Sequence, residues 1–156
     1  MSVSFAHHER LAICRVDYHG AIWVEDLEAL ARFRIEHPRW HGFDHLHVIH
    51  PDADVSQLSR ATLDRLFFKH QPLFDASKQL VRRRSAWVCR NPAARAALEY
   101  WVGDAEKRPR AQAEARLFDR VDAACAWLGL GASEKTLAES GEGFSEIARF
   151  NAARAA

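Results

Sequence analysis

The sequence predicts an α/β fold in a single domain, with a mixed, mostly parallel sheet, an N-terminal β-hairpin and flanking helices. Two strand-like segments joined by a short link open the chain, and three later strand-like segments are each followed by a helical one. The predicted order is therefore ββαβαβαβα. Because a helical connection brings two strands of one sheet parallel, the hairpin is expected at one side of a parallel sheet.

The first elements are strands over residues 3–8 and 11–19 and a helix over residues 24–37. The link between the two strands has hairpin length. The helix is expected to end at Pro38, since proline disfavours helical geometry at the residue before it. Its apolar residues fall at helical spacing, which predicts one buried stripe: Leu27, Leu30, Ala31 and Ile35.

The sequence predicts a central strand over residues 43–51, followed by an acidic turn over residues 52–54. Ser56 is a suitable N-cap for the next helix. That helix is expected to run to about Gln71 and to end at Pro72, which lacks a backbone N–H.

The next unit is a strand over residues 85–89 and a helix that starts at Asn91-Pro92 and runs to about Val102. Asparagine at the cap with proline at the first helical position is a typical helix start. Residues 73–81, which precede this unit, are expected to form a short turn or helix. Residues 103–114, which follow it, are expected to be a charged, solvent-exposed stretch.

The last unit is a strand over residues 115–118 and a helix that Asp119 caps and Gly129 ends. Residues 1–130 are therefore assigned to the domain. Residues 131–156 are expected to lie outside it, as a polar Gly/Ser-rich linker over 131–142 followed by an amphipathic or partly disordered helix over 144–154.

Composition excludes several classes of protein. The 156 residues carry a formal net charge of +1, whereas nucleic-acid and anionic-membrane binders usually have a clear basic excess. We find no apolar run of transmembrane length and no signal peptide, so a cytoplasmic location is expected. The three cysteines are odd in number and far apart, which favours reduced, buried thiols: Cys14, Cys89 and Cys125.

Two local patterns carry a family resemblance. One is the hairpin that ends at Gly20 before the acidic helix start Glu25-Asp26-Leu27, and the other is the strand and helix over residues 116–129, which ends in Trp127-Leu128-Gly129. Over residues 3–130 the chain resembles the SpoIIAA-like family, which shares the STAS and Sec14-like topology. The resemblance implies a cytoplasmic, non-enzymatic domain.

The STAS relatives of that family are switched by phosphorylation of a serine in an Asp-Ser-Ser-Gly-like segment. The comparable segment here is Ser59-Arg60-Ala61-Thr62, which lacks that motif and leaves Ser56 and Ser59 as nearby hydroxyls. The resemblance therefore implies the fold of the switch without its phosphoacceptor motif.

Seven residues are candidates for binding a ligand or partner. Asp52 and Asp54 follow the central strand at its carboxyl end, where ligands of open α/β sheets bind. Adjacent residues of one helix face different ways, so one of Phe67 and Phe68 is expected at the surface, at a pocket or a dimer interface. The remaining candidates occupy the regulatory position of a STAS domain: Ser56, Ser59 and Arg60.

Catalytic and metal chemistry have weak signatures. His45 and His47 point to the same face of a strand, about 7 Å apart along it, and need a third ligand from elsewhere to hold a metal. Satisfied imidazoles on a half-polar sheet face are the simpler interpretation. The sequence contains neither a GxSxG elbow nor a phosphate-cradling glycine loop, so we expect no catalytic residue and no cofactor.

Three hypotheses follow, in order of preference. The first is a regulatory or protein-interaction module of the STAS type, expected to form a homodimer or to bind a protein partner. The second is a carrier of a small apolar ligand or lipid, because five tryptophans and nine phenylalanines are many for one small core. The third is a metal-dependent enzyme that uses His45 and His47.

Overall fold

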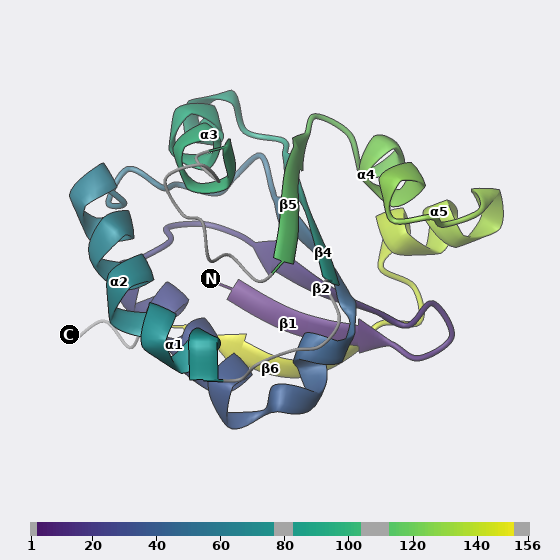
Figure 1. The fold of residues 1–156 in the computed structure, drawn as a ribbon. Coiled ribbons are helices and arrows are strands. Elements are labelled where there is room, and N and C mark those ends of the chain that lie inside the picture. The colour runs from purple at the N-terminus through teal and green to yellow at the C-terminus, as the bar shows by residue number, and fades with distance from the viewer. Residues whose placement is uncertain (1–2, 77–82, 104–112, 152–156) are drawn as a thin grey trace.

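The computed structural model describes residues 3–76, 83–103 and 113–151 and confirms the α/β fold with its N-terminal hairpin. One six-stranded sheet, in the order β5-β4-β3-β2-β1-β6, runs through the centre of the molecule (Figure 1). The strands are β1 (Val3–His8), β2 (Ile13–Tyr18), β3 (Asp44–Ile49), β4 (Arg83–Cys89), β5 (Ala113–Phe118) and β6 (Ser145–Phe150).

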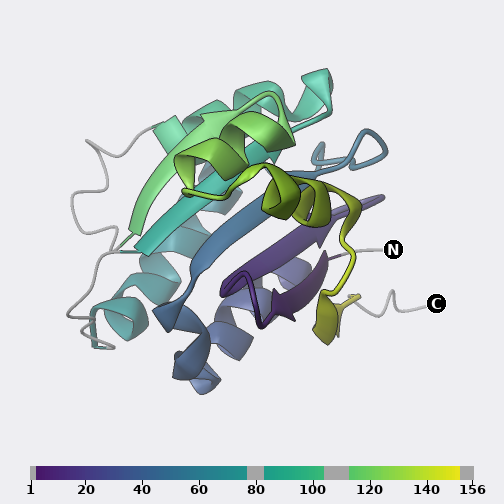
Figure 2. The ribbon, with the colours of Figure 1, turned by 90° about the vertical axis from the view of Figure 1, so that its right-hand side faces the viewer.

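Helices cover both faces of this sheet. Helices α1 to α3 lie on one face, and α4 and α5 lie on the other (Figure 2). Among the described residues, no helix is both long and apolar enough to cross a membrane. The helices are α1 (Val24–Glu36), α2 (Arg60–Ala76), α3 (Arg95–Gly103), α4 (Val121–Trp127) and α5 (Ala132–Ser140), with 3-10 turns η1 (Pro38–Gly42) and η2 (Pro92–Ala94).

Strand pairing follows the prediction from the chain order. Strands β1 and β2 are antiparallel, and β2, β3, β4 and β5 pair in parallel. Tyr18 lies opposite Ile49, and Ile49 lies opposite Cys89. The parallel strands therefore end together along one side of the sheet, which we call the carboxyl edge.

Alternation along the strands divides the side chains between two cores. On β2, Cys14 and Val16 face the α1 side, where they pack with Leu30. Ile13 packs on the opposite side with Val121 and other residues of α4. Adjacent residues at the carboxyl edge therefore point into different environments.

Helix α2 differs from its predicted bounds at both ends. It begins at Arg60, and Ser59 rather than Ser56 provides the cap, since its Oγ accepts a hydrogen bond from Thr62 N at 3.1 Å. The Ser56 N–H is already used, because it donates to Asp54 Oδ1 at 2.9 Å in a local turn. The helix also continues through Pro72 to Ala76, so the lost backbone donor of proline does not end it as predicted.

Smaller predictions are confirmed or corrected in the same way. The Asn91 side chain accepts from Ala93 N at 3.0 Å, so the predicted cap is confirmed, although the first turn is 3-10. Arg120, not Asp119, stands at the N-cap of α4. The predicted segments at 77–81 and 104–112 lie outside the described residues.

The tail is where the prediction was wrong. Residues 132–140 form helix α5, not a linker, and Ala138 of that helix is fully buried against the α4 side of the sheet. Glu134 holds the backbone N–H of Gly131 at 2.8 Å at the start of this helix. Gly141 ends it with φ +79°, the left-handed conformation that glycine adopts most easily.

Residues 145–150 form strand β6, not an amphipathic helix. This strand pairs antiparallel with β1, with Ala148 opposite Phe5 and Phe150 opposite Val3. The free edge of β1 supplies backbone hydrogen-bond partners that an isolated tail lacks, and this outweighs the local helical spacing of apolar residues. The domain therefore extends to residue 150, and the hairpin is not at the edge of the sheet.

Close contact with the hairpin holds the start of β6 in place. The Phe144 ring lies 5.1 Å from the His8 ring, centroid to centroid. A Cβ atom at Gly143 would lie only 2.6 Å from His8 Nε2, and Gly143 has φ +80°. Only glycine suits this approach, so the path of the tail is specified by the sequence.

Phe150→Ala should lower the free energy of unfolding by about 1–3 kcal/mol, because the half-buried Phe150 ring packs on Phe33 with centroids 5.6 Å apart. Ile147→Ala is the matched control, since Ile147 lies on the same strand and is 42% exposed. Urea unfolding measures both. Equal, negligible effects of the two changes would contradict the packing of β6 on the domain.

Candidate functional site

Two groups of polar side chains lie on opposite faces of the sheet, one at the carboxyl edge and the other over β2 and β3. We call Asp17, His19, His50 and Asp52 the edge cluster; its members lie at the ends of β2 and β3 or just beyond. We call Tyr18, Arg34, His45 and His47 the interior cluster; its members lie between the sheet and α1.

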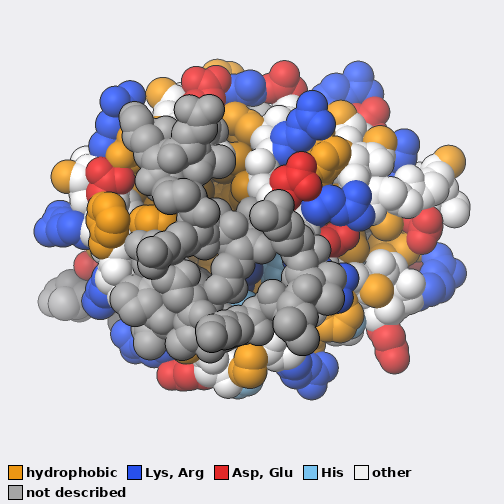
Figure 3. All heavy atoms as spheres, in the orientation of Figure 1, with side chains coloured by type: hydrophobic (Ala, Val, Ile, Leu, Met, Phe, Trp, Pro, Cys, Tyr) orange, Lys and Arg blue, Asp and Glu red, His pale blue; other side chains and the backbone are white. Residues whose placement is uncertain are grey.

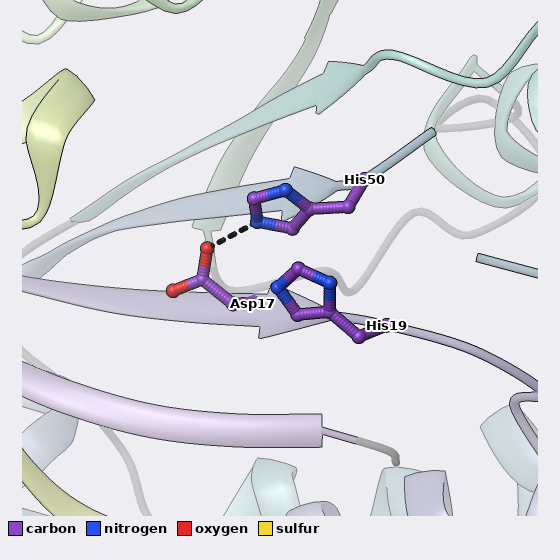
Figure 4. A group of neighbouring side chains, drawn as sticks. All are labelled: Asp17, His19 and His50. Carbon is purple, nitrogen blue, oxygen red and sulfur yellow. Dashed lines mark hydrogen bonds and ion pairs between the residues drawn. The ribbon is translucent and has the colours of Figure 1, made fainter. Parts of the chain in front are cut away.

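The edge cluster is a chain of carboxylate and imidazole contacts. His50 Nε2 lies 2.6 Å from Asp17 Oδ1, and His19 Nδ1 lies 3.0 Å from Asp52 Oδ1. The two imidazoles are stacked, with ring centroids 3.8 Å apart and planes 17° apart. Figure 4 shows Asp17, His19 and His50 gathered at the ends of neighbouring strands.

Arg15 anchors this cluster to the rest of the fold. Its Nε and Nη2 donate to the Asp17 carboxylate at 2.8–3.0 Å, and its Nη1 donates to the Ala138 carbonyl of α5 at 2.5 Å. Burial raises the pKa of Asp17, but hydrogen bonds from His50 and Arg15 outweigh it, and the net shift is downward. Asp17 is therefore a firmly held carboxylate at neutral pH.

The ligand atoms of the edge cluster have the spacing that a metal ion requires. Asp17, His19 and His50 each offer one atom, and these atoms all lie within 4.8 Å of one another. Within the parts of the chain that the structure describes, they are the one such group of three or more histidine, cysteine or acidic residues. The predicted pair His45 and His47 does not gain a third ligand there.

The predicted histidines instead form the centre of the interior cluster. The His47 ring is stacked on Trp87, with centroids 3.8 Å apart and planes 6° apart, and its Nδ1 hydrogen-bonds with the Tyr18 hydroxyl at 3.0 Å. The His45 ring lies 6.0 Å from that of His47. Burial lowers the pKa of both histidines well below the ordinary value, so both are neutral at pH 7.

Arg34 brings a guanidinium into the same interior. It follows Leu27 and Leu30 at the i, i+3, i+7 spacing of one helix stripe, and Leu30 is buried in the core. Burial lowers the pKa of Arg34, and its charge in turn contributes to the lowered pKa of the neighbouring histidines. The Nε atom is buried and has no hydrogen-bond partner among the described residues.

The acidic turn is part of the site only through its first residue. Asp52 joins the edge cluster, where Oδ2 also accepts from Gly20 N at 3.2 Å. The backbone of Asp54 bonds to Gly20 O and Ile22 N, both at 2.8 Å. Asp54 and Ser56 thus form a turn that fastens the loop after β3 to the loop after β2.

The predicted candidates on α2 have structural contacts. Ser59 caps the helix, and its Oγ lies 2.8 Å from Thr62 Oγ1. The Arg60 guanidinium lies 5.0 Å from the centroid of the Tyr100 ring on α3. Phe67 is half-buried and Phe68 is 67% exposed, which confirms that the two rings face different ways.

A pocket of about 520 Å³ opens beyond the ends of β4 and β5. Its Arg95 guanidinium is paired with both Glu99 and Asp119, so the positive charge is neutralised. Burial raises the pKa of the Cys89 thiol, and its Sγ donates to Asn91 O at 3.0 Å. The Arg95 charge is therefore not available to a ligand in this pocket, and the Cys89 thiol is not a reactive thiolate.

The sequence reasoning missed Asp17, His19 and Arg34. Asp17 and His19 precede His50 by more than thirty residues, and only the parallel register of β2 and β3 brings them together. The signal for Arg34 was present, since a charged residue occupies a position on an otherwise apolar helix stripe. A charged residue at such a position faces the core rather than solvent, which favours a specific role for its charge.

The neutral interior histidines predict a protein that loses stability in mild acid. The pKa of each histidine is lower in the folded protein than in the unfolded chain. The contribution of the neutral histidines to the free energy of unfolding is therefore fully present above about pH 6.5 and is lost as the pH falls below it. The loss is up to about 1.4 kcal/mol per pH unit for each histidine. His45→Leu should remove one such contribution from the slope of unfolding free energy against pH.

Urea unfolding at several values between about pH 5 and 6.5 measures this slope. His37→Gln is the control for removal of a histidine, because His37 is exposed at the end of α1. An unchanged slope in His45→Leu would show that His45 takes up a proton in the folded protein.

Comparisons with family models, curated proteins and solved structures find no match to this chain. The resemblance to the SpoIIAA-like family therefore stays a prediction. Any function has to be argued from the geometry of the two clusters.

Proposed function

We propose that this chain is a small-ligand-binding module that holds an organic anion between the sheet and α1. The observation that supports the proposal is the guanidinium of half-buried Arg34, whose buried Nε has no hydrogen-bond partner among the described residues, beside neutral histidines. The proposal modifies the sequence-based hypothesis of an apolar-ligand carrier by adding a negative group to the ligand.

The charge of Arg34 has no match within the described structure. No described carboxylate forms an ion pair with it, and the two titratable groups that raise its pKa, Tyr18 and Cys14, are neutral. Burial raises the pKa of Cys14 to about 12 and the pKa of Tyr18 further still. A buried charge without a partner is costly, so an anion that enters this interior is bound strongly.

Other unpaired polar atoms lie on the same side of the sheet. His45 Nε2 and His7 Nε2 are buried, and neither has a hydrogen-bond partner among the described residues. A neutral imidazole donates one hydrogen bond; His45 donates it to the Phe43 backbone, whereas His7 can donate it to a carboxylate or phosphate oxygen. Figure 3 shows the molecule in the orientation of Figure 1, with pale-blue histidine atoms among the described side chains on this face.

The buried side chains around the cluster suit an apolar or planar ligand body. The Trp87 and Tyr18 rings are stacked 5.9 Å apart, and Phe5, Phe33 and Trp40 form edge contacts at 5.3–5.7 Å. Binding sites for small molecules combine such apolar walls with a few fixed polar groups. The ligand class that fits is a small carboxylate or phosphate ester with an aromatic or aliphatic body.

A regulatory role is the second candidate, and the exposed Phe68 ring favours it. An exposed aromatic residue on a helix next to Lys69 can contact a protein partner or a second copy of the chain. A STAS-type switch and a homodimer stay predictions. A metal-dependent enzyme based on His45 and His47 has less support, since Nδ1 of His47 is occupied by Tyr18.

Arg34→Met should abolish anion binding and stabilise the empty protein by about 1–2 kcal/mol, because it removes an unpaired buried charge and keeps the apolar volume. Arg32→Met is the control on the exposed face of α1. Thermal unfolding with benzoate, octanoate and phenyl phosphate measures binding. At least one of these anions should raise the Tm of the native protein and of Arg32→Met, and none should raise the Tm of Arg34→Met.

Two results would overturn the proposal. One is an equal response to the neutral analogues benzyl alcohol and octanol, which would make the ligand simply apolar. The other is an unchanged anion response in Arg34→Met, which would exclude the guanidinium from the site.

A further inference from the structure

We propose that Asp17, His19 and His50 form a binding site for a divalent transition-metal ion at the carboxyl edge. The site lies on the α5 side of the sheet, opposite the interior cluster, and does not depend on anion binding there. Three independent features support it: the spacing of the ligand atoms, the partners that orient them, and their exposure.

The spacing is close to that of a coordinated ion. Zinc binds histidine nitrogen and carboxylate oxygen at about 2.0–2.2 Å, which places neighbouring ligand atoms about 3–4 Å apart. The three ligand atoms lie within 4.8 Å of one another, and His50 Nε2 already lies 2.6 Å from Asp17 Oδ1. Side-chain rotations alone, without a backbone shift, can bring them to an ion.

Asp52 orients His19 for this role. A carboxylate only accepts hydrogen bonds, so His19 Nδ1 donates to Asp52 and its Nε2 keeps a free lone pair. Figure 4 shows one ring nitrogen of His19 directed toward Asp17 and His50. A carboxylate that holds the far nitrogen of a histidine is the usual support of a metal-binding imidazole.

Asp17 is held in place from the opposite direction. Arg15 binds both of its carboxylate oxygens and ties them to α5, so the ligand is fixed before an ion arrives. At His50, an ion would take the place of the proton that Nε2 now shares with Asp17, and the imidazole would carry its proton on Nδ1. The guanidinium lies close to the ion, so we expect micromolar rather than nanomolar affinity.

The ligand types select the metal. Two imidazoles and one carboxylate suit zinc, cobalt and similar ions, whereas calcium and magnesium prefer oxygen ligands. The His19 side chain is 33% exposed and Asp52 is 59% exposed, so water can reach the ion. Three protein ligands with an open position resemble catalytic zinc sites more than closed structural ones.

Titration of the untagged chain with Co²⁺ and with Zn²⁺ tests the site. Visible absorption of bound Co²⁺ reports nitrogen and oxygen ligands, and calorimetry with Zn²⁺ gives stoichiometry and affinity. One ion should bind per chain. His19→Ala should lower the affinity at least tenfold, and Asp52→Ala should lower it about 10–100-fold, because it removes the acceptor that orients His19.

His37→Ala is the matched control, since His37 is an exposed histidine at the end of α1. It should bind both metals as the native protein does. Both His19 and His37 lie outside the cores, so loss of folding does not confuse the result. Equal affinity in His19→Ala and the native protein, or no binding of either metal below millimolar concentration, would overturn the proposal.

Discussion

The parallel register of β2, β3 and β4 is the constraint on which both clusters depend. Backbone pairing sets Tyr18 beside Ile49, and Ile49 beside Cys89, so three chain segments turn at the same edge. Because side chains alternate along a strand, the pairing also decides which residues meet on each face. A shift of one residue would exchange the two sets of side chains and bury the charges of the edge cluster.

The two clusters treat charge in opposite ways. On the α5 side, the Asp17 carboxylate pairs with the Arg15 guanidinium and hydrogen-bonds with His50. On the α1 side, Arg34 has no anionic partner within the described structure. Networks of paired charges are common in stable folds. A buried charge without an ion-pair partner lowers stability, so its presence favours a function such as ligand binding.

Much of the fold could be predicted because the signals were local. The hairpin link and the helix between each pair of later strands indicate the parallel sheet without any knowledge of packing. Strand β6 could not be predicted, since Phe144, Ile147 and Phe150 also fit a helix and only the free edge of β1 decides between the two structures. Asp52 could also be predicted from a local signal, because it directly follows the predicted central strand over residues 43–51.

Spacing in sequence did not indicate which histidines lie close to a third potential ligand. His45 and His47 are close in the chain and share a face, but the sheet places them under aromatic rings, where Tyr18 and Trp87 occupy the space around His47. His19 and His50 are far apart in the chain, yet they lie just beyond neighbouring strands, where side chains are free to converge. In a parallel sheet, residues at the carboxyl end of a strand or just past it are therefore better candidate ligands than residues at its start or middle.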